Sequence, residues 1–280
     1  MATTYWTGAG SASDFDDASN WSGSAPSSGD TAVIADKDTA IADSSVTSTY
    51  ANLRIGEGFT GSIGVGVSGG QAVANAALTE IDINTKAKLS LKGSATYLTI
   101  SDTRGSTDGF KWHGSADYLR ILGGSGTMQF IGADVTTSTE VFGLGGTTVT
   151  FDSDCDLAGS YVQDSGMVEC SCGIAGTVEV RGGTLTLKAG NYGTITITGG
   201  GRVIDERTAT ASITNLNVYN GEFTGVNASG DVMTIGTVKL YENGTIDERN
   251  GALAYTFTNP IQYIGPGKFY ADFGRKLTQS

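Results

Sequence analysis

The chain has 280 residues, and its composition departs from that of an average globular domain, because 42 positions are glycine and only 3 are proline. The formal net charge of −12 argues against a nucleic-acid backbone or an anionic membrane as a partner, since both need clustered Lys and Arg. No amphipathic-helix pattern lasts beyond two turns, and no apolar run could span a bilayer. The composition therefore predicts an all-β chain with many tight corners.

Residues 1–30 are expected to form an irregular N-terminal cap. Large aromatic residues, among them Trp6 and Trp21, alternate there with Gly, Ser and Asn. Such a segment can cover the open end of a coiled stack of strands, where apolar side chains and strand edges would otherwise be exposed. The first residues lack the basic and apolar segments of a secretory signal, so we expect synthesis in the cytoplasm without export.

The spacing of residues in this cap resembles a motif found ahead of right-handed parallel β-helices in bacterial surface proteins and bacteriophage structural proteins. The resemblance covers about a tenth of the chain and carries no catalytic residues. It implies a β-helix in the following residues and a structural role. The motif consists of Trp6, Gly8, Asn20, Trp21, Pro26, Gly29, Asp30, Thr31 and Val33.

Residues 31–257 carry the pattern expected of the β-helix itself. Short alternating apolar segments run from Val33 to Val67, a stretch of weak periodicity at 69–78 predicts a loop or small excursion, and regularity returns at Ile81. At about 20 residues a coil, this predicts about eleven coils.

The clearest repeats lie between Gly176 and Arg249, where strand, glycine corner and strand recur. The step from Ile195 to Leu216 is 21 residues and the step from Leu216 to Val238 is 22. A period near 20 is typical of a β-solenoid, whose coils bury their apolar faces only by stacking.

One tetrapeptide, Ile-Asp-Glu-Arg, occurs twice within these repeats, at 204–207 and at 246–249. The copies lie 42 residues apart, which corresponds to two coils. The pairs Glu206–Arg207 and Glu248–Arg249 are therefore expected at matching, exposed positions on one wall. Exposed ion pairs add at most about 1 kcal/mol each, so they indicate register rather than function.

Residues 258–280 break this rhythm and are expected to form a C-terminal closing or docking tail. The tail either covers the last coil or packs on a neighbouring subunit, where aromatic residues and Arg are enriched. Both irregular ends supply candidate interface residues, namely Trp6, Trp21, Tyr263, Phe269, Tyr270, Phe273 and Arg275.

The best candidate for chemistry is an acidic triplet, Asp152, Asp154 and Asp156. Alternation along a strand would place all three carboxylates on one face, and three close carboxylates repel unless a cation or water lies between them. A solvated face is the favoured interpretation, calcium is a weak alternative, and catalysis is the least favoured. We expect no cofactor.

Histidine and cysteine add little to this chemistry. His113 is the single histidine and is expected at the surface or at a corner. The cysteines at 155, 170 and 172 lack the spacing of a zinc site and are odd in number, so we expect reduced, mostly buried thiols.

These features predict a right-handed parallel β-helix that acts as a structural protein and not as an enzyme. The first hypothesis is a bacteriophage virion protein, either a capsid decoration protein or a tail accessory protein, assembled as a homotrimer and bound to the major capsid protein or other virion proteins. The second is a tail spike or fibre protein that binds or depolymerises host surface glycans. The third is a bacterial β-helical surface adhesin.

Overall fold

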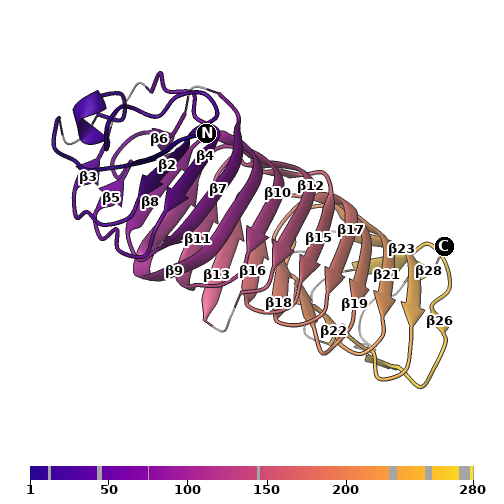
Figure 1. Ribbon diagram of the computed structural model, residues 1–280. Coiled ribbons are helices and arrows are strands. Elements are labelled where there is room, and N and C mark those ends of the chain that lie inside the picture. The colour runs from indigo at the N-terminus through magenta and orange to yellow at the C-terminus, as the bar shows by residue number, and fades with distance from the viewer. Residues whose placement is uncertain are drawn as a thin grey trace. The chain divides into compact units, whose positions relative to one another are not determined.

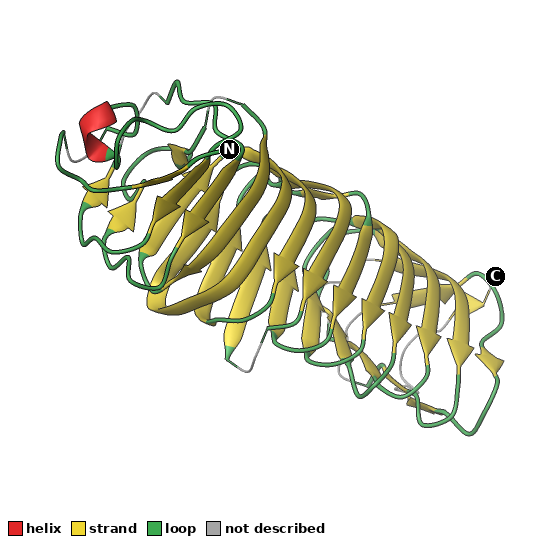
Figure 2. Ribbon diagram, in the orientation of Figure 1, coloured by secondary structure: helices red, strands yellow, loops and turns green. Residues whose placement is uncertain are grey.

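The computed structural model describes residues 1–11, 14–42, 46–74, 76–143, 146–226, 232–249, 254–270 and 278–279. Parallel strands stack as a β-solenoid of about ten turns, which confirms the predicted fold class (Figure 2). The chain divides into two compact units, Met1–Thr136 with Gly143–Thr148, and Thr137–Phe142 with Val149–Ser280. The helical content of the described ranges is one 3-10 turn, η1 (Ala18–Asn20).

The first unit has two walls of parallel strands. The first wall contains β1 (Thr3–Tyr5), β2 (Thr31–Ile34), β4 (Asn52–Ile55), β7 (Leu78–Thr85), the start of β9 (Ser94–Trp112) and β10 (Ser115–Ile121). The second wall contains β3 (Ala40–Ile41), β5 (Ser62–Ile63), β6 (Gln71–Ala72), β8 (Lys88–Lys92), the end of β9 and β11 (Ser125–Phe130). β12 (Asp134–Val141) begins in this unit and continues in the second.

Aromatic side chains form the core of the N-terminal cap. Trp6 and Trp21 meet edge to face, with ring centroids 5.1 Å apart, and Phe15 packs against both. The indole N–H of Trp21 donates to the Phe15 carbonyl at 2.8 Å. β1 pairs with β2, so part of the cap continues the first wall.

A carboxylate clamp ties this cap to the segment that follows β3. Asp16 accepts four hydrogen bonds, from the backbone N–H and hydroxyl groups of Thr47 and Ser48. Burial raises the pKa of Asp16, but the hydrogen bonds from Ser48 and Thr47 outweigh it, so the pKa lies below its ordinary value.

The second unit repeats the two-wall plan. After β12, its first wall contains β14 (Asp156–Leu157), β15 (Ser160–Gln163), β17 (Ile174–Val180), β19 (Tyr192–Ile197), β21 (Ala211–Val218), β23 (Val232–Leu240), β25 (Ala254–Phe257), β26 (Gln262–Tyr263) and β28 (Thr278–Gln279). The second wall contains the end of β13 (Thr147–Phe151), which begins in the first unit, and then β16 (Met167–Cys170), β18 (Thr184–Leu187), β20 (Arg202–Asp205), β22 (Glu222–Gly225), β24 (Thr245–Asp247) and β27 (Lys268–Tyr270).

The predicted repeat register is confirmed in the second unit, where β17, β19, β21 and β23 lie side by side (Figure 1). Val178 pairs with Ile195, Ile195 with Leu216, and Leu216 with Val238. All four side chains are buried, so each coil covers the apolar residue of the coil before it. At about 25 cal/mol for each Å² of apolar surface, such stacking is the main stabilising contribution.

The two Ile-Asp-Glu-Arg copies do not occupy matching positions, which corrects the sequence-based expectation. Ile204 pairs with Thr224, and Thr224 pairs with Asp247, so the second copy is displaced by one residue. A displacement of one residue turns a side chain from one face of a strand to the other. Asp205 therefore faces the interior, whereas Asp247 aligns with Ile204, at a position where side chains of this wall point outward.

This displacement produces a fully buried ion pair and a second pair in which Arg249 is exposed while Asp247 is mostly covered, each between Asp and Arg two residues apart. Arg207 donates two hydrogen bonds to Asp205, at 2.8 Å each, and both side chains are 0% exposed. Arg207 also donates to the carbonyl oxygens of Gly190 and Ser212. By contrast, the Arg249 side chain paired with Asp247 is 56% exposed.

Replacing each arginine by methionine should therefore have unequal effects. Arg207→Met leaves the Asp205 carboxylate buried without its cation, and we expect a loss of about 3–5 kcal/mol in the free energy of unfolding. Arg249→Met, the matched control, should cost about 1 kcal/mol or less. Denaturant unfolding of both variants measures the difference, and equal losses would contradict the assigned register.

The Asp16 clamp predicts a change in acid stability. Its depressed pKa contributes stability that is present above the unfolded value, about 3.9, and is lost as the pH falls through the lower folded value. Asp16→Asn should lower the free energy of unfolding at pH 7 by about 1–3 kcal/mol, because its amide N–H₂ cannot accept. The free energy of unfolding of this variant should also change less with pH between pH 7 and pH 2 than that of the wild type. The exposed control Asp38→Asn should retain the wild-type profile.

Candidate functional site

An insertion interrupts the second wall of the first unit between β5 and β6. Ile63 of β5 pairs with Leu89, and Gln71 of β6 pairs with Leu91, so residues 64–70 stand opposite the single residue Ser90. The sequence predicts a loop or excursion at 69–78, whereas the structure shows the insertion at 64–70, followed by β6 at Gln71–Ala72. Extra residues in one strand of a pair form a bulge that redirects the chain, and bulges recur beside functional sites.

The insertion folds as two consecutive turns. Val67 donates its backbone N–H to the Gly64 carbonyl, and Gly70 donates to the Val67 carbonyl, each at 3.1 Å. Gly64 has φ +68°, and a Cβ there would lie 2.1 Å from the Ser90 carbonyl oxygen. Only glycine fits at this first turn, because both the backbone angle and the space exclude a side chain.

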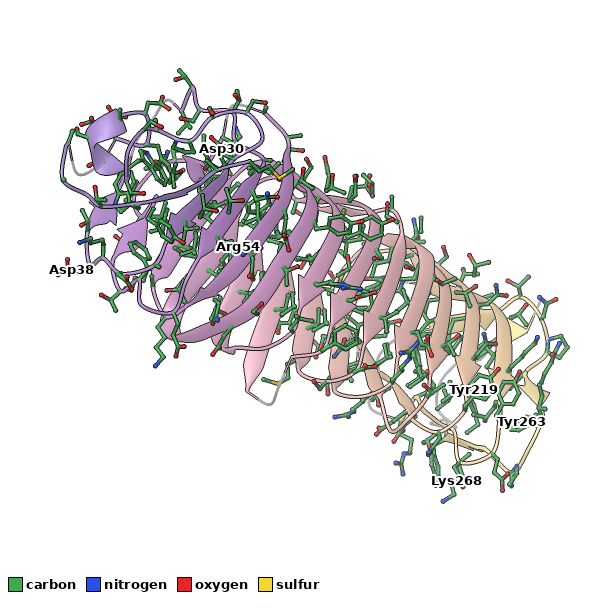
Figure 3. The ribbon with its side chains drawn as sticks, viewed as in Figure 1. Asp30, Asp38, Arg54, Tyr219, Tyr263 and Lys268 are labelled. Carbon is green, nitrogen blue, oxygen red and sulfur yellow. The ribbon has the colours of Figure 1, made fainter. Side chains whose placement is uncertain are left out.

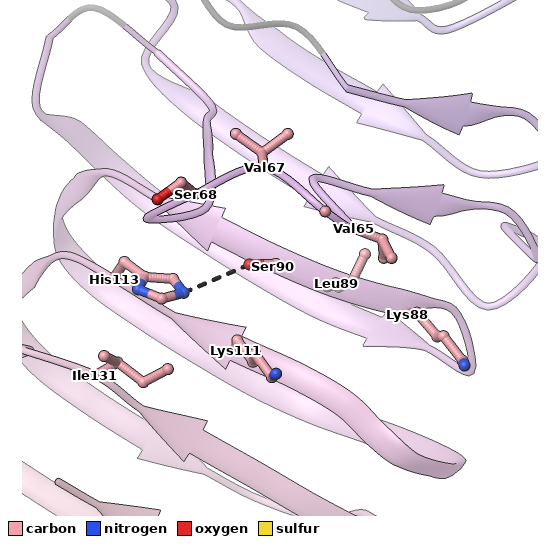
Figure 4. A pocket seen from close by; sticks show the side chains of 10 residues that line it. Val65, Val67, Ser68, Lys88, Leu89, Ser90, Lys111, His113 and Ile131 are labelled. Carbon is pink, nitrogen blue, oxygen red and sulfur yellow. Dashed lines mark hydrogen bonds between the residues drawn. The ribbon is translucent and has the colours of Figure 1, made fainter.

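A hollow of about 400 Å³ lies beside the insertion. Lys88 and Ser90 come from β8, Lys111 and His113 come from β9 or directly follow it, and the insertion forms the opposite side (Figure 4). The Ser90 hydroxyl and His113 Nε2 are 3.4 Å apart. The apolar part of the lining consists of Val65, Val67, Leu89 and Ile131.

The polar side chains of this hollow are suited to binding rather than to nucleophilic attack. The insertion covers Ser90, which is buried, so a substrate has little access to its hydroxyl. Lys88 is exposed and Lys111 is half-buried. None of the ion pairs formed by the described residues involves either lysine. The sequence predicts His113 at the surface or at a corner, but it does not reveal that His113 lines the same hollow as the two lysines.

The acidic triplet at 152–156 does not form the expected strand face. β13 ends at Phe151, and the chain turns through Asp152 to Cys155 before β14 begins at Asp156. Asp152 accepts from the Asp154 backbone N–H at 3.1 Å, so its carboxylate stabilises the turn. Within the described ranges, no group of three His, Cys, Asp or Glu side chains is arranged to hold a metal ion.

The three cysteines lie together in the core of the second unit, and their predicted burial is confirmed. The Cys170 and Cys172 sulfur atoms are 3.5 Å apart, and a hydrogen bond with Cys172 lowers the pKa of Cys170. Hydrogen bonds with Cys155 and Cys170 raise the pKa of Cys172. Tyr192 donates its hydroxyl to the Cys172 carbonyl at 2.8 Å. These contacts join the thiols to the buried arginine, because Arg207 lies over the Tyr192 ring.

The candidate interface residues divide between buried and exposed. Trp6 and Trp21 are each 3% exposed, so they form the cap's own core and offer almost no surface to a partner, contrary to their selection as interface residues. Tyr263 is 58% exposed, while Phe269 and Tyr270 are more covered (Figure 3 shows Tyr263). Phe273 and Arg275 lie outside the described residues.

Three further side chains near this end, Ile264, Tyr219 and Tyr241, were not predicted as interface residues. Ile264 directly follows Tyr263 and is 54% exposed. Tyr219 and Tyr241 stack with ring centroids 3.8 Å apart, because their strands are neighbours in register. Their spacing of 22 residues matches the coil period and could have revealed the stack.

No family model matches this chain, and no curated protein or solved structure shows significant similarity to it. In the described ranges, no helix has both the length and the apolar character needed to cross a membrane.

The thiol cluster predicts slow chemical modification in the folded protein. Because all three thiols are buried, an aromatic disulfide reagent should react at least about a hundredfold faster after unfolding in guanidinium. The release of the coloured thiolate measures the rate. Ser24→Cys places a fourth thiol at an exposed position and should react at once in the folded state. Rapid reaction of the native cysteines would contradict their burial.

Proposed function

We propose that this chain is a structural protein of a bacteriophage virion, of the capsid-decoration type, that assembles as a homotrimer and attaches through its C-terminal end. The resemblance of the cap motif to phage proteins supports the class. The exposure of large apolar side chains on the last described coil carries the proposal of attachment.

That last coil continues the stack instead of folding away from it. β26 pairs with β23, and β27 pairs with β24, so both strands are held by the preceding coil. Tyr263 and Ile264 are nevertheless more than half exposed, and Tyr263 occupies the position that the buried residues Leu240 and Val218 hold in the earlier coils. Fixed, exposed aromatic side chains lose little conformational freedom on binding, which favours a protein interface.

Arg249 adds a polar component to this end. Its guanidinium lies 4.5 Å from the centroid of the Tyr270 ring and also pairs with Asp247. A planar guanidinium held in place by a ring and a carboxylate is ready to contact a partner, and Arg is enriched in interfaces. We define the end surface as Tyr263, Ile264, Tyr270 and Arg249.

A role in binding host glycans is the second candidate, and the hollow beside Lys88 and Lys111 favours it. That role places this chain in a tail spike or fibre instead of on the capsid. The two candidates use different parts of the molecule, since the hollow belongs to the first unit and the end surface to the second.

The proposed attachment predicts the behaviour of a double variant, Tyr263→Ser with Ile264→Ser. Wild-type protein should sediment with particles purified from cells that carry the gene, at a fixed copy number. The double variant should lose at least about tenfold in particle-bound protein, because two exposed apolar contacts are removed. Quantitative mass spectrometry of the particle fraction measures the ratio.

Tyr97→Ser is the matched control, because Tyr97 is an exposed tyrosine in the first unit and should not affect attachment. Native mass spectrometry of the free protein tests the homotrimer. Wild-type chain that stays in the supernatant contradicts the virion role. Equal attachment of wild type and double variant contradicts the end surface alone.

A further inference from the structure

We propose that the hollow beside residues 64–70 is a binding site for a sugar-sized ligand that carries a carboxylate, sulfate or phosphate group. A structural spacer needs no such site, so this inference goes beyond the proposed attachment to a capsid; it deepens the second candidate, glycan binding, by naming the charged class of ligand.

Four polar side chains form the floor of the site: Lys88 and Ser90 of β8, Lys111 of β9, and His113, which directly follows β9. Ser90 of β8 pairs with Lys111 of β9. Lys88 lies two residues before Ser90, and His113 lies two residues after Lys111. Residues two apart on a strand share a face, so all four side chains face the same side of the wall. Paired positions are about 4.8 Å apart, and positions two residues apart about 6.6 Å. This spacing matches the dimensions of one sugar ring and its substituents.

The charge of the floor selects for an anion. Lys88 and Lys111 bring two ammonium groups to one small area of a chain whose net charge is −12. Neither lysine takes part in an ion pair among the described residues. An anion bound in the hollow is attracted by both ammonium groups.

The walls of the hollow add a surface for the uncharged part of the ligand. Val65 and Val67 of the insertion line the hollow together with Ile131, which follows β11, and Val65 is 53% exposed (Figure 4). Apolar side chains around a few polar groups are typical of small-molecule sites, and about 400 Å³ lies within their size range. A sugar ring presents C–H groups to such walls while its charged substituent contacts the lysines.

The His113 ring is held in position from two sides. Its backbone N–H donates to the Leu91 carbonyl at 2.8 Å, and Nε2 lies 3.4 Å from the Ser90 hydroxyl. Gly70 adjoins the ring, because a Cβ at that position would lie 2.8 Å from His113 Cδ2. The insertion thus holds the imidazole in place beside Lys111, and a side chain that is already fixed loses little conformational freedom when a ligand binds.

Titration of the isotope-labelled protein with three sugars tests the proposal. The probes are glucuronate, glucose 6-phosphate and, as the neutral comparison, glucose. Amide chemical shifts of residues 64–70, 88–90 and 111–113 should move with at least one charged probe and stay unchanged with glucose at the same concentration. Glucuronate and glucose 6-phosphate together also show whether the site prefers a carboxylate or a phosphate.

Single substitutions locate the binding. Lys111→Gln and Lys88→Gln should each weaken binding of the charged probe about tenfold, since each removes one charged hydrogen-bond donor. Lys86→Gln removes an equal charge from an exposed position outside the hollow and should change binding less than about twofold. Circular dichroism and the melting temperature establish that each variant is folded.

The outcomes separate specific binding from general attraction. Selective shifts that Lys111→Gln and Lys88→Gln weaken and Lys86→Gln leaves unchanged support the site. The proposal is overturned if neither charged probe moves these amides, if glucose moves them equally, or if Lys86→Gln weakens binding as strongly as the other two.

Discussion

The structure depends on one constraint, the register between successive coils. Side chains alternate between the two faces of a strand, so an apolar residue reaches the core only if its strand pairs at the correct position with the strand before it. Val178, Ile195, Leu216 and Val238 meet this condition in four consecutive strands of the second unit. Each coil is thereby covered by the next coil, and its strands set the pairing positions of the strands in that coil.

Register also decides which polar groups the core must accommodate. Two identical tetrapeptides have different environments because one is displaced by a single residue, which buries Asp205 with Arg207 and leaves Arg249 exposed beside Tyr270. Burying charges is costly, and the cost is offset here by hydrogen bonds from Arg207 to a carboxylate and two carbonyl oxygens. The exposed copy is free to take part in contacts with a partner.

Much of the fold could be predicted from the sequence, because period and alternation are local properties. The 21- and 22-residue steps, the glycine corners and the buried thiols all follow from spacing and residue type. Other features depend on pairing between distant residues and could not be predicted. Ser90 and His113 are brought together only when β8 pairs with β9. Asp152 lies in a turn, and not in the predicted strand, where its carboxylate accepts a hydrogen bond from the Asp154 backbone.

Regular coils supply a scaffold, and the proposed functions belong to the insertion at 64–70 and to the exposed side chains of the C-terminal coil. The most direct test of this account is a register measurement by cysteine cross-linking in the second unit. Glu222 and Thr245 face outward and pair directly, so Glu222→Cys with Thr245→Cys should form a disulfide under mild oxidation, seen by peptide mass spectrometry. A folded double variant that does not cross-link, while Glu222→Cys with Asp247→Cys does, would contradict the register.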